Sequence, residues 1–251
     1  MSSQYDGFAH SYRKAVALDV RRYVDNFSLF KVLGDVAGKS TLDVGCGTGA
    51  IARMLKQRGA RSVVGLDISE SMLEVARGEE ASNPLGVEYV RCDIADAGAL
   101  GPFDAVTASY VLPHASSQVQ LFTMCQGIFE ALAPGGRFVA IQPDGRFAVN
   151  DPEYYEPYGM RAYVDGPLED AAPLRVTMTS ADTEFTIRAH YWTSEGYTSA
   201  LRRAGFTDIR WCSPEVAPEG IAALGPAFWT KYLARPWAML LDCAKPPAPP
   251  P

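Results

Sequence analysis

The chain has 251 residues, of which 47% are apolar, and a formal net charge of -6. This length supports one main core without a metal or a disulfide framework, and the five scattered cysteines form no Cys-x-x-Cys pair, so we expect reduced thiols in a cytoplasmic protein. Dispersed lysines and arginines disfavour a nucleic-acid partner. The lack of a long apolar run or basic leader disfavours membrane spanning and secretion.

Helical and strand patterns alternate through the first part of the chain. The predicted elements are a helix over 12–33, strands at 40–44, 62–66, 87–91, 103–109 and 137–141, and helices at 50–58, 70–77 and 118–132. Strict alternation implies crossover connections between parallel strands. We therefore expect an α/β fold with a doubly wound, mostly parallel sheet and helices on both faces.

The alternation stops after residue 141. Residues 142–173 hold several prolines and tyrosines without a clear period, and we interpret 142–192 as an inserted cap and hairpin over the substrate. The other predicted elements are hairpin strands at 174–179 and 184–191, a helix at 194–204 and strands at 207–211 and 237–244. We expect a single domain over 1–245 and a disordered, proline-rich tail over 246–251.

A glycine-rich turn follows the first strand of the alternating region. Gly45 and Gly47 stand between that strand and the next helix, so a ligand can approach bare backbone amides there. Taken alone, Gly45-x-Gly47-x-x-Ala50 also satisfies the loose pattern of nicotinamide dehydrogenases. The turn predicts a nucleotide-like ligand without identifying it.

Three acidic residues stand at the ends of successive predicted strands. Asp43 precedes the glycines, where a carboxylate would attract a sulfonium or ammonium group and repel a pyrophosphate. Asp67 ends the second strand and can accept both hydroxyls of a ribose, and Asp93 follows the third strand, beside an expected adenine. Asp43 could instead be a helix-capping or loop-bonding carboxylate, and Asp93 could begin a turn before Asp96. Jointly, the three acids favour a cationic nucleoside ligand.

These segments resemble the class I, Rossmann-like S-adenosylmethionine-dependent methyltransferases from about residue 41 to 141. The matching segments are Leu42 to Gly49, Gly65 to Ser69 with Met72 and Leu73, Cys92 to Ile94, Phe103 to Leu112, and Leu132 to Arg137. The resemblance implies a seven-stranded sheet whose last strand is antiparallel. It also implies S-adenosylmethionine as cofactor and S-adenosylhomocysteine as product.

The cofactor-binding residues that we infer from these motifs lie in several segments. They are Tyr5, Tyr12, Asp43, Gly45, Cys46, Gly47, Asp67, Ile68, Met72, Asp93, Ile94 and Ser109. Within the family, the patterns Tyr5-Asp6-x-x-Ala9-x-x-Tyr12 and Trp192 to Phe206 look like bacterial small-molecule enzymes of secondary metabolism. The toxoflavin-type N-methyltransferases are the nearest specific comparison.

Methyl transfer from a sulfonium is an in-line displacement, so alignment of donor and acceptor supplies much of the rate. A protonated acceptor would also gain from a general base. His114, after the fourth strand, is the first candidate, although it could equally cap the following helix; His10 is the second and His190 the third. No metal is expected in the mechanism.

Aromatic residues outside the alternating scaffold could form walls against a flat acceptor. The inferred substrate-binding residues are Tyr110, His114, Tyr154, Tyr158, Phe228 and Trp229. They favour a small planar aromatic or N-heterocyclic acceptor, methylated on nitrogen or oxygen. An NAD(P)-dependent oxidoreductase and a non-catalytic cofactor-binding scaffold remain open, as does the choice between monomer and homodimer.

Overall fold

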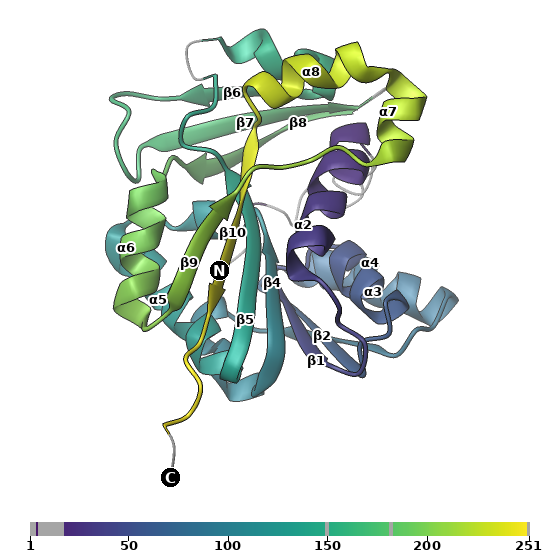
Figure 1. Cartoon of the computed structure of the whole chain (residues 1–251), viewed down its shortest axis with the longest axis vertical. Helices are drawn as coiled ribbons and strands as arrows, with labels where there is room; N and C mark the ends of the chain where they lie inside the picture. The colour runs from purple at the N-terminus through teal and green to yellow at the C-terminus, as the bar shows by residue number, and fades with distance from the viewer. Residues whose placement is uncertain (1–3, 5–17, 149–150, 181–182, 250–251) are drawn as a thin grey trace.

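The computed structural model describes residue 4 and residues 18–148, 151–180 and 183–249. A seven-stranded sheet forms the centre of the molecule, with a smaller three-stranded sheet above it (Figure 1). The order of the central strands is β3 (Val87–Arg91), β2 (Ser62–Asp67), β1 (Ser40–Val44), β4 (Phe103–Ser109), β5 (Leu132–Pro143), β10 (Ala238–Ala244) and β9 (Thr207–Cys212).

Only the last strand of the chain runs against the rest of the central sheet. The first five strands pair in parallel, whereas β10 is antiparallel to both β5 and β9. Both the doubly wound fold and its antiparallel last strand are thereby confirmed. Since the order of the strands reverses between β1 and β4, the connections that follow these two strands diverge and leave room for a ligand at that edge.

Helices cover both faces of the central sheet, as predicted. One face packs against α2 (Asn26–Leu33), α3 (Ala50–Gln57) and α4 (Glu70–Ser82), and the other against η3 (Ile94–Leu100), α5 (Gln118–Ala131) and α6 (Ser194–Ala204). Along β1 the side chains alternate between these layers: Leu42 and Val44 are fully buried on the α5 side, and Asp43 faces the α3 side. Buried strands of this kind are well specified by their apolar runs.

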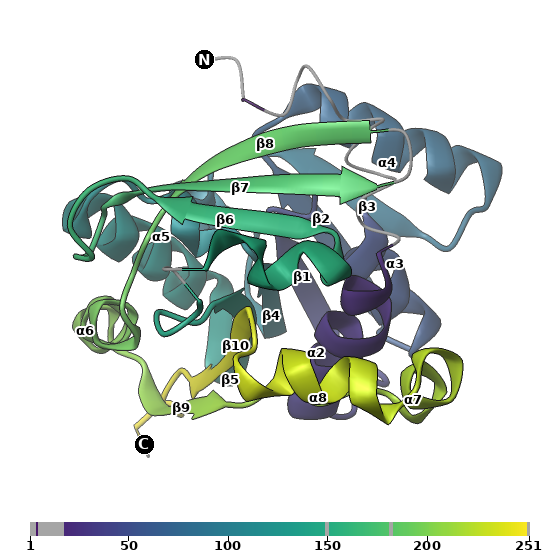
Figure 2. The ribbon, with the colours of Figure 1, turned by 90° about the horizontal axis from the view of Figure 1, so that it is seen from above.

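The three-stranded sheet lies across the upper edge of the central sheet (Figures 1 and 2). It is antiparallel and consists of β6 (Met160–Val164), β7 (Pro173–Ser180) and β8 (Thr183–His190). The hairpin β7–β8 was predicted, but β6 was not, because the prolines and tyrosines around it hide its short alternation of buried Met160 and Ala162. We call β6–β8 the cap sheet.

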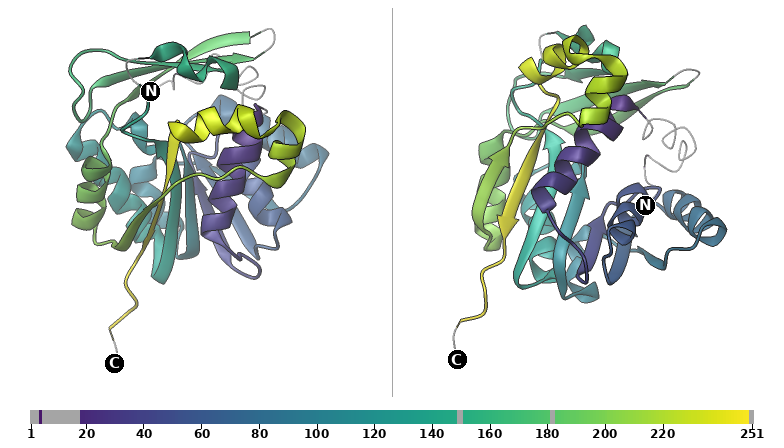
Figure 3. Two further views of the ribbon diagram at one scale, coloured as in Figure 1. Left: turned by 45° about the horizontal axis from the view of Figure 1, so that its top comes forward. Right: turned by 45° about the vertical axis from the view of Figure 1, so that its right-hand side comes forward.

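Short helices flank the cap sheet. They are η5 (Pro152–Tyr158), α7 (Pro218–Leu224) and α8 (Pro226–Ala234), and Figure 3 shows α7 and α8 beside η2 (Arg21–Asp25), which continues into α2. The sequence analysis missed all three, since each begins with proline and is too short to display a helical period. Residues 246–249 form neither helix nor strand, and the Pro246 carbonyl accepts a hydrogen bond from the Gly135 amide at 3.2 Å.

The structure extends two elements beyond their predicted limits. Helix α4 continues to Ser82, past the predicted end at 77, because its last turn is anchored to the strand that follows. Strand β5 begins at Leu132, where the predicted helix was expected to end. Within the described ranges, no helix combines the length and apolar character that crossing a bilayer would need.

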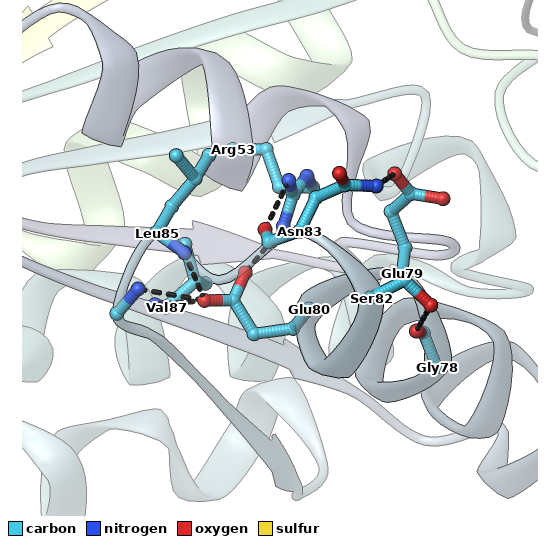
Figure 4. Close-up of polar contacts among 9 residues, drawn as sticks. Arg53, Gly78, Glu79, Glu80, Ser82, Asn83, Leu85 and Val87 are labelled. Carbon is cyan, nitrogen blue, oxygen red and sulfur yellow. Dashed lines mark hydrogen bonds and ion pairs between the residues drawn. The ribbon is translucent and has the colours of Figure 1, made fainter.

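The anchor of α4 is a carboxylate that bonds several amides (Figure 4). Glu80 accepts hydrogen bonds from the amides of Leu85 at 2.5 Å, Gly86 at 2.6 Å and Val87 at 3.3 Å, and it forms an ion pair with Arg53 of α3. Burial raises the pKa of Glu80, but the hydrogen bonds from the three amides and the charge of Arg53 lower it, and the net shift is downward. The carboxylate therefore fixes the turn into β3.

Replacement of Glu80 by alanine should lower the free energy of unfolding by roughly 2–3 kcal/mol, since amides lose a charged acceptor. Urea denaturation monitored by circular dichroism measures this loss. Glu79→Ala is the matched control, because Glu79 contacts Asn83 on the exposed surface of the same helix and should cost about 0.5 kcal/mol or less. Equal losses for the two variants would contradict the anchoring role of Glu80.

Candidate functional site

A cavity of about 690 Å³ lies at the edge of the central sheet where the parallel strands end. This volume is within the range of small-molecule sites, roughly 300–1,000 Å³. The lining residues come from the loops after β1, β2, β3 and β4, from α5 and from β8 of the cap sheet. The cavity therefore lies between the edge of the central sheet and the cap sheet.

Most of the predicted cofactor-binding residues of the described chain meet in this cavity. Those that line it are Gly45, Gly47, Asp67, Ile68, Met72, Asp93, Ile94 and Ser109. The predicted Tyr5, Tyr12 and His10 lie outside the described residues. Asp43 and Cys46 are not among the lining residues.

The glycine turn forms one wall of the cavity. Gly45 and Gly47 have φ angles of 61° and 54°, in the left-handed region that favours glycine. A Cβ atom on Gly45 would also overlap the side chain of Val111, which lines the same cavity. The turn thus needs glycine both for its backbone conformation and for the close approach of the loop after β4.

Asp67 holds the glycine turn in place. Its Oδ2 accepts a hydrogen bond from the Gly47 amide at 2.8 Å, and its Oδ1 accepts one from the Ser69 amide at 2.9 Å. The carboxylate is half-buried at the end of β2 and lines the cavity. Each carboxylate oxygen has a further lone pair, so Asp67 can also accept hydroxyl groups of a ribose.

Asp43 supports the turn from behind. It is 2% exposed, and its Oδ1 accepts a hydrogen bond from the Thr107 hydroxyl at 2.8 Å across the β1–β4 pair. Burial raises the pKa of Asp43 to about 7, against hydrogen bonds from Thr107 and the Ala52 amide, and the charge of Asp67 adds to the rise. These partners lie in β4 and in the first turn of α3, so this geometry matches the helix-capping role that the sequence left open.

The loop after β3 forms the adenine end of the site that the sequence motif implies. Asp93 is exposed, and its Oδ1 accepts a hydrogen bond from the Ala95 amide at 3.0 Å, which begins η3. Ile68 is 48% exposed although it is apolar, whereas Met72 is buried. An exposed isoleucine beside a carboxylate offers a face for a flat ring and an acceptor for its amino group.

Tyr110, the residue after β4, also lines the cavity. It has a positive φ of 58°, an uncommon conformation for a tyrosine that is frequent at ligand sites. Its hydroxyl donates to Asp25 Oδ2 at 2.8 Å, and the Arg21 guanidinium lies 3.9 Å from the centre of its ring. Residues of η2 therefore fix the one predicted aromatic wall that does line the cavity.

Two histidines line the cavity beneath the cap sheet. His114 ends η4 (Leu112–His114), and His190 ends β8. Burial, with a smaller contribution from His190, lowers the pKa of His114 to about 4, and burial also lowers the pKa of His190. Both rings are neutral at pH 7, so His114 is suited to accept a hydrogen bond and is a weak proton acceptor.

The other predicted substrate-binding aromatics do not line this cavity. They pack against one another between η5 and α8, with ring centres 4.9 Å apart for Tyr158 and Phe228 and for Phe228 and Trp229. The Tyr158 hydroxyl donates to the Phe228 carbonyl at 2.9 Å, and Tyr154 donates to the Lys231 carbonyl. These four aromatics belong to the core beneath α8.

Several lining residues were missed by the sequence analysis. They are Gln4, Leu66, Cys92, Ala95, Val111, Gln120, Thr123, Met124 and Arg188. Residues of α5 and β8 carry no motif, because their place in the cavity depends on how the cap sheet folds over the central sheet. Thr107, which bonds Asp43 behind the turn, was missed as well, because the strand pairing that sets it opposite Asp43 is known only from the structure.

The charges around the glycine turn fit a cationic nucleoside better than a dinucleotide. Asp67 and Asp93 line that end, and Arg188 of the cap is the one lysine or arginine among the described lining residues. A pyrophosphate would meet carboxylates there, whereas a sulfonium or ammonium group would be attracted. The fold and site thus define a doubly wound protein for a cationic nucleoside cofactor.

Comparisons with known proteins agree with this class. Residues 41–136 match the family model of a methyltransferase domain. A ubiquinone biosynthesis O-methyltransferase of Pseudomonas paraeruginosa is 33% identical over 132 residues, which cover 46% of this chain and 55% of that protein. The chain therefore aligns with about half the length of this curated relative.

Solved structures of similar fold cover most of the chain. A structure titled as a putative S-adenosylmethionine-dependent methyltransferase of Listeria monocytogenes is 25% identical, covers 87% of this chain and 95% of that one, and gives a TM-score of 0.61. One from Mesorhizobium loti, at 23% identity, covers 92% and 99% with the same TM-score. Residues 41–136 thus match a methyltransferase domain, and the overall fold is the Rossmann-like fold of S-adenosylmethionine-dependent methyltransferases, whose cofactor is S-adenosylmethionine.

Proposed function

We propose that this protein transfers a methyl group from S-adenosylmethionine to a small, planar aromatic or N-heterocyclic acceptor. The observation that carries the proposal is that one cavity is lined by two unlike groups of residues. One group is the glycine turn with Asp67 and Asp93, and the other is Tyr110, His114 and His190. A methyl donor and a flat acceptor would meet between them.

The bound cofactor would supply an electrophilic methyl group on sulfur. The chain's own residues would orient the two reactants and exclude water, and such alignment supplies roughly 7–11 kcal/mol of a displacement barrier. Tyr110 is suited to position the acceptor, since Asp25 and Arg21 fix its ring. His114 and His190, both neutral at pH 7, are suited to accept hydrogen bonds from an acceptor hydroxyl or N–H group.

The similarity to ubiquinone biosynthesis O-methyltransferases favours oxygen as the methylated atom, and the lining aromatic ring favours a flat acceptor. A role in secondary metabolism, a toxoflavin-like heterocyclic substrate and a cytoplasmic location remain predictions from the sequence. So do the absence of a nucleic-acid partner and the suggested cap role of 142–192.

The test is turnover with isotope-labelled S-adenosylmethionine and a panel of phenols, catechols, heterocycles and aromatic acids, followed by mass spectrometry of the products. Transfer of label to an aromatic member of the panel would support the proposal. Tight cofactor binding without transfer to any member would favour the non-catalytic scaffold that the sequence left open.

A further inference from the structure

Arg188 of β8 lies on the cap side of the cavity. Its backbone is fixed on both sides by the Gln4 side chain: the Arg188 amide donates to Gln4 Oε1 at 2.9 Å, and the Arg188 carbonyl accepts from Gln4 Nε2 at 2.8 Å. The same Gln4 nitrogen lies 3.5 Å from His114 Nδ1. The root of the arginine side chain is therefore held at the cavity wall.

The Arg188 guanidinium has neither an ion pair nor a hydrogen bond with any residue that the structure describes. Arg175, directly opposite on β7, is different: its guanidinium bonds both oxygens of Asp165, at 2.8 and 2.9 Å. Two like charges opposite each other in a sheet are unfavourable unless one is offset. Here Asp165 compensates the charge of Arg175, which does not line the cavity, and leaves the charge of Arg188 uncompensated.

The cavity is consequently charged at two places of opposite sign. Asp67 and Asp93 provide carboxylates where the cofactor is expected, and Arg188 provides a cation on the cap side. The two histidines near it are neutral at pH 7, so they would not compete for an anion. An acceptor held between cofactor and cap would place one of its groups within the field of Arg188.

We propose that Arg188 binds a carboxylate on the methyl acceptor, which makes an aromatic carboxylic acid the substrate class. The planar guanidinium matches a carboxylate with two parallel N–H bonds, a geometry that lysine cannot provide. This inference rests on the proposed function, since it specifies the acceptor of that same cavity.

The test uses three aromatic carboxylates, benzoate, 3,4-dihydroxybenzoate and pyridine-4-carboxylate, each paired with its neutral primary amide. Binding to the full chain saturated with S-adenosylhomocysteine is measured by calorimetry. At least one carboxylate should bind 10-fold or more tightly than its amide, because a charge-assisted pair is lost in the amide. Arg188→Gln should abolish this preference, and Arg188→Lys should retain only part of it.

Arg175→Gln is the matched control, since it removes an equal charge from the adjacent strand and should keep the preference. Equal binding of all acids and amides by the unmodified chain, or a preference that survives in Arg188→Gln, would overturn the inference. Methyl transfer to the same six compounds separates the two proposals. Equal methylation of acid and amide refutes the role of Arg188 alone, whereas carboxylate binding without any methyl transfer refutes the proposed function.

Discussion

Asp67→Ala is expected to weaken the binding of S-adenosylhomocysteine by roughly 100-fold or more while the chain stays folded. Two hydroxyl groups bonded to one carboxylate each contribute about 1.5–3 kcal/mol, and the variant loses both. It also loses the bonds from the Gly47 and Ser69 amides that hold the glycine turn. Calorimetric titration measures the affinity, and circular dichroism verifies the fold.

Two further variants make the interpretation of Asp67 specific. Asp67→Asn retains one oxygen acceptor and should fall between alanine and the unmodified chain. Asp96 is an exposed residue of the neighbouring η3 and does not itself line the cavity, so Asp96→Ala should leave the affinity unchanged. An unaltered affinity in a folded Asp67→Ala chain would remove Asp67 from the cofactor site.

Asp43 should make the stability of the cofactor-free chain depend on pH. Its pKa is about 7 in the fold, against 3.8 for an ordinary aspartate, because burial penalises the charged form. The folded chain therefore holds this proton more tightly than the unfolded chain. The resulting stability is complete below pH 3.8 and is lost as the pH rises through about 7, a total of roughly 4 kcal/mol.

Asp43→Asn imitates the protonated form and can still accept from the Thr107 hydroxyl. The unfolding free energy of the unmodified chain should fall relative to that of the variant between pH 4 and 7, and the difference should level off above pH 8. Urea denaturation at four pH values measures this difference in unfolding free energy. Asp96→Asn, which changes an exposed carboxylate, is the control. Parallel profiles for the unmodified chain and Asp43→Asn would mean that the buried carboxylate is not destabilised.

Comparison with the variant is needed because other carboxylates act in the opposite sense. Backbone and side-chain hydrogen bonds from Ser40 lower the pKa of Asp104, and the amides around Glu80 lower its pKa. These groups contribute stability that is lost as the pH falls. Their contributions cancel between the two chains, so the difference isolates Asp43.

The central sheet could be predicted from the sequence because its strands are buried on both faces. Apolar runs placed β1, β3 and β4 at their observed residues, and the glycine turn, Asp67 and Asp93, which the sequence grouped together, line one cavity. Such signals are local in the chain. A strand end and the loop after it are enough to locate a ligand in an open α/β sheet.

The cap side of the cavity depends on contacts between distant segments, and the sequence does not reveal them. Tyrosines in η5 and aromatics in α8 were interpreted as walls of the acceptor site, but in the structure their rings pack against one another and the Tyr158 hydroxyl bonds the Phe228 carbonyl. Arg188 showed no motif, because its significance comes from the fold of β8 over the cavity and from its lack of the acidic partner that Arg175 has. Charge balance around a cavity can be judged only after the fold is known.

The central claim is that the cavity accepts a nucleoside sulfonium, S-adenosylmethionine, and its thioether product, S-adenosylhomocysteine. Parallel titration of the chain with S-adenosylhomocysteine and with NADH tests it most directly. We expect saturable binding of S-adenosylhomocysteine with one site per chain, and at least 100-fold weaker binding of NADH. Preferential binding of NADH would contradict the account.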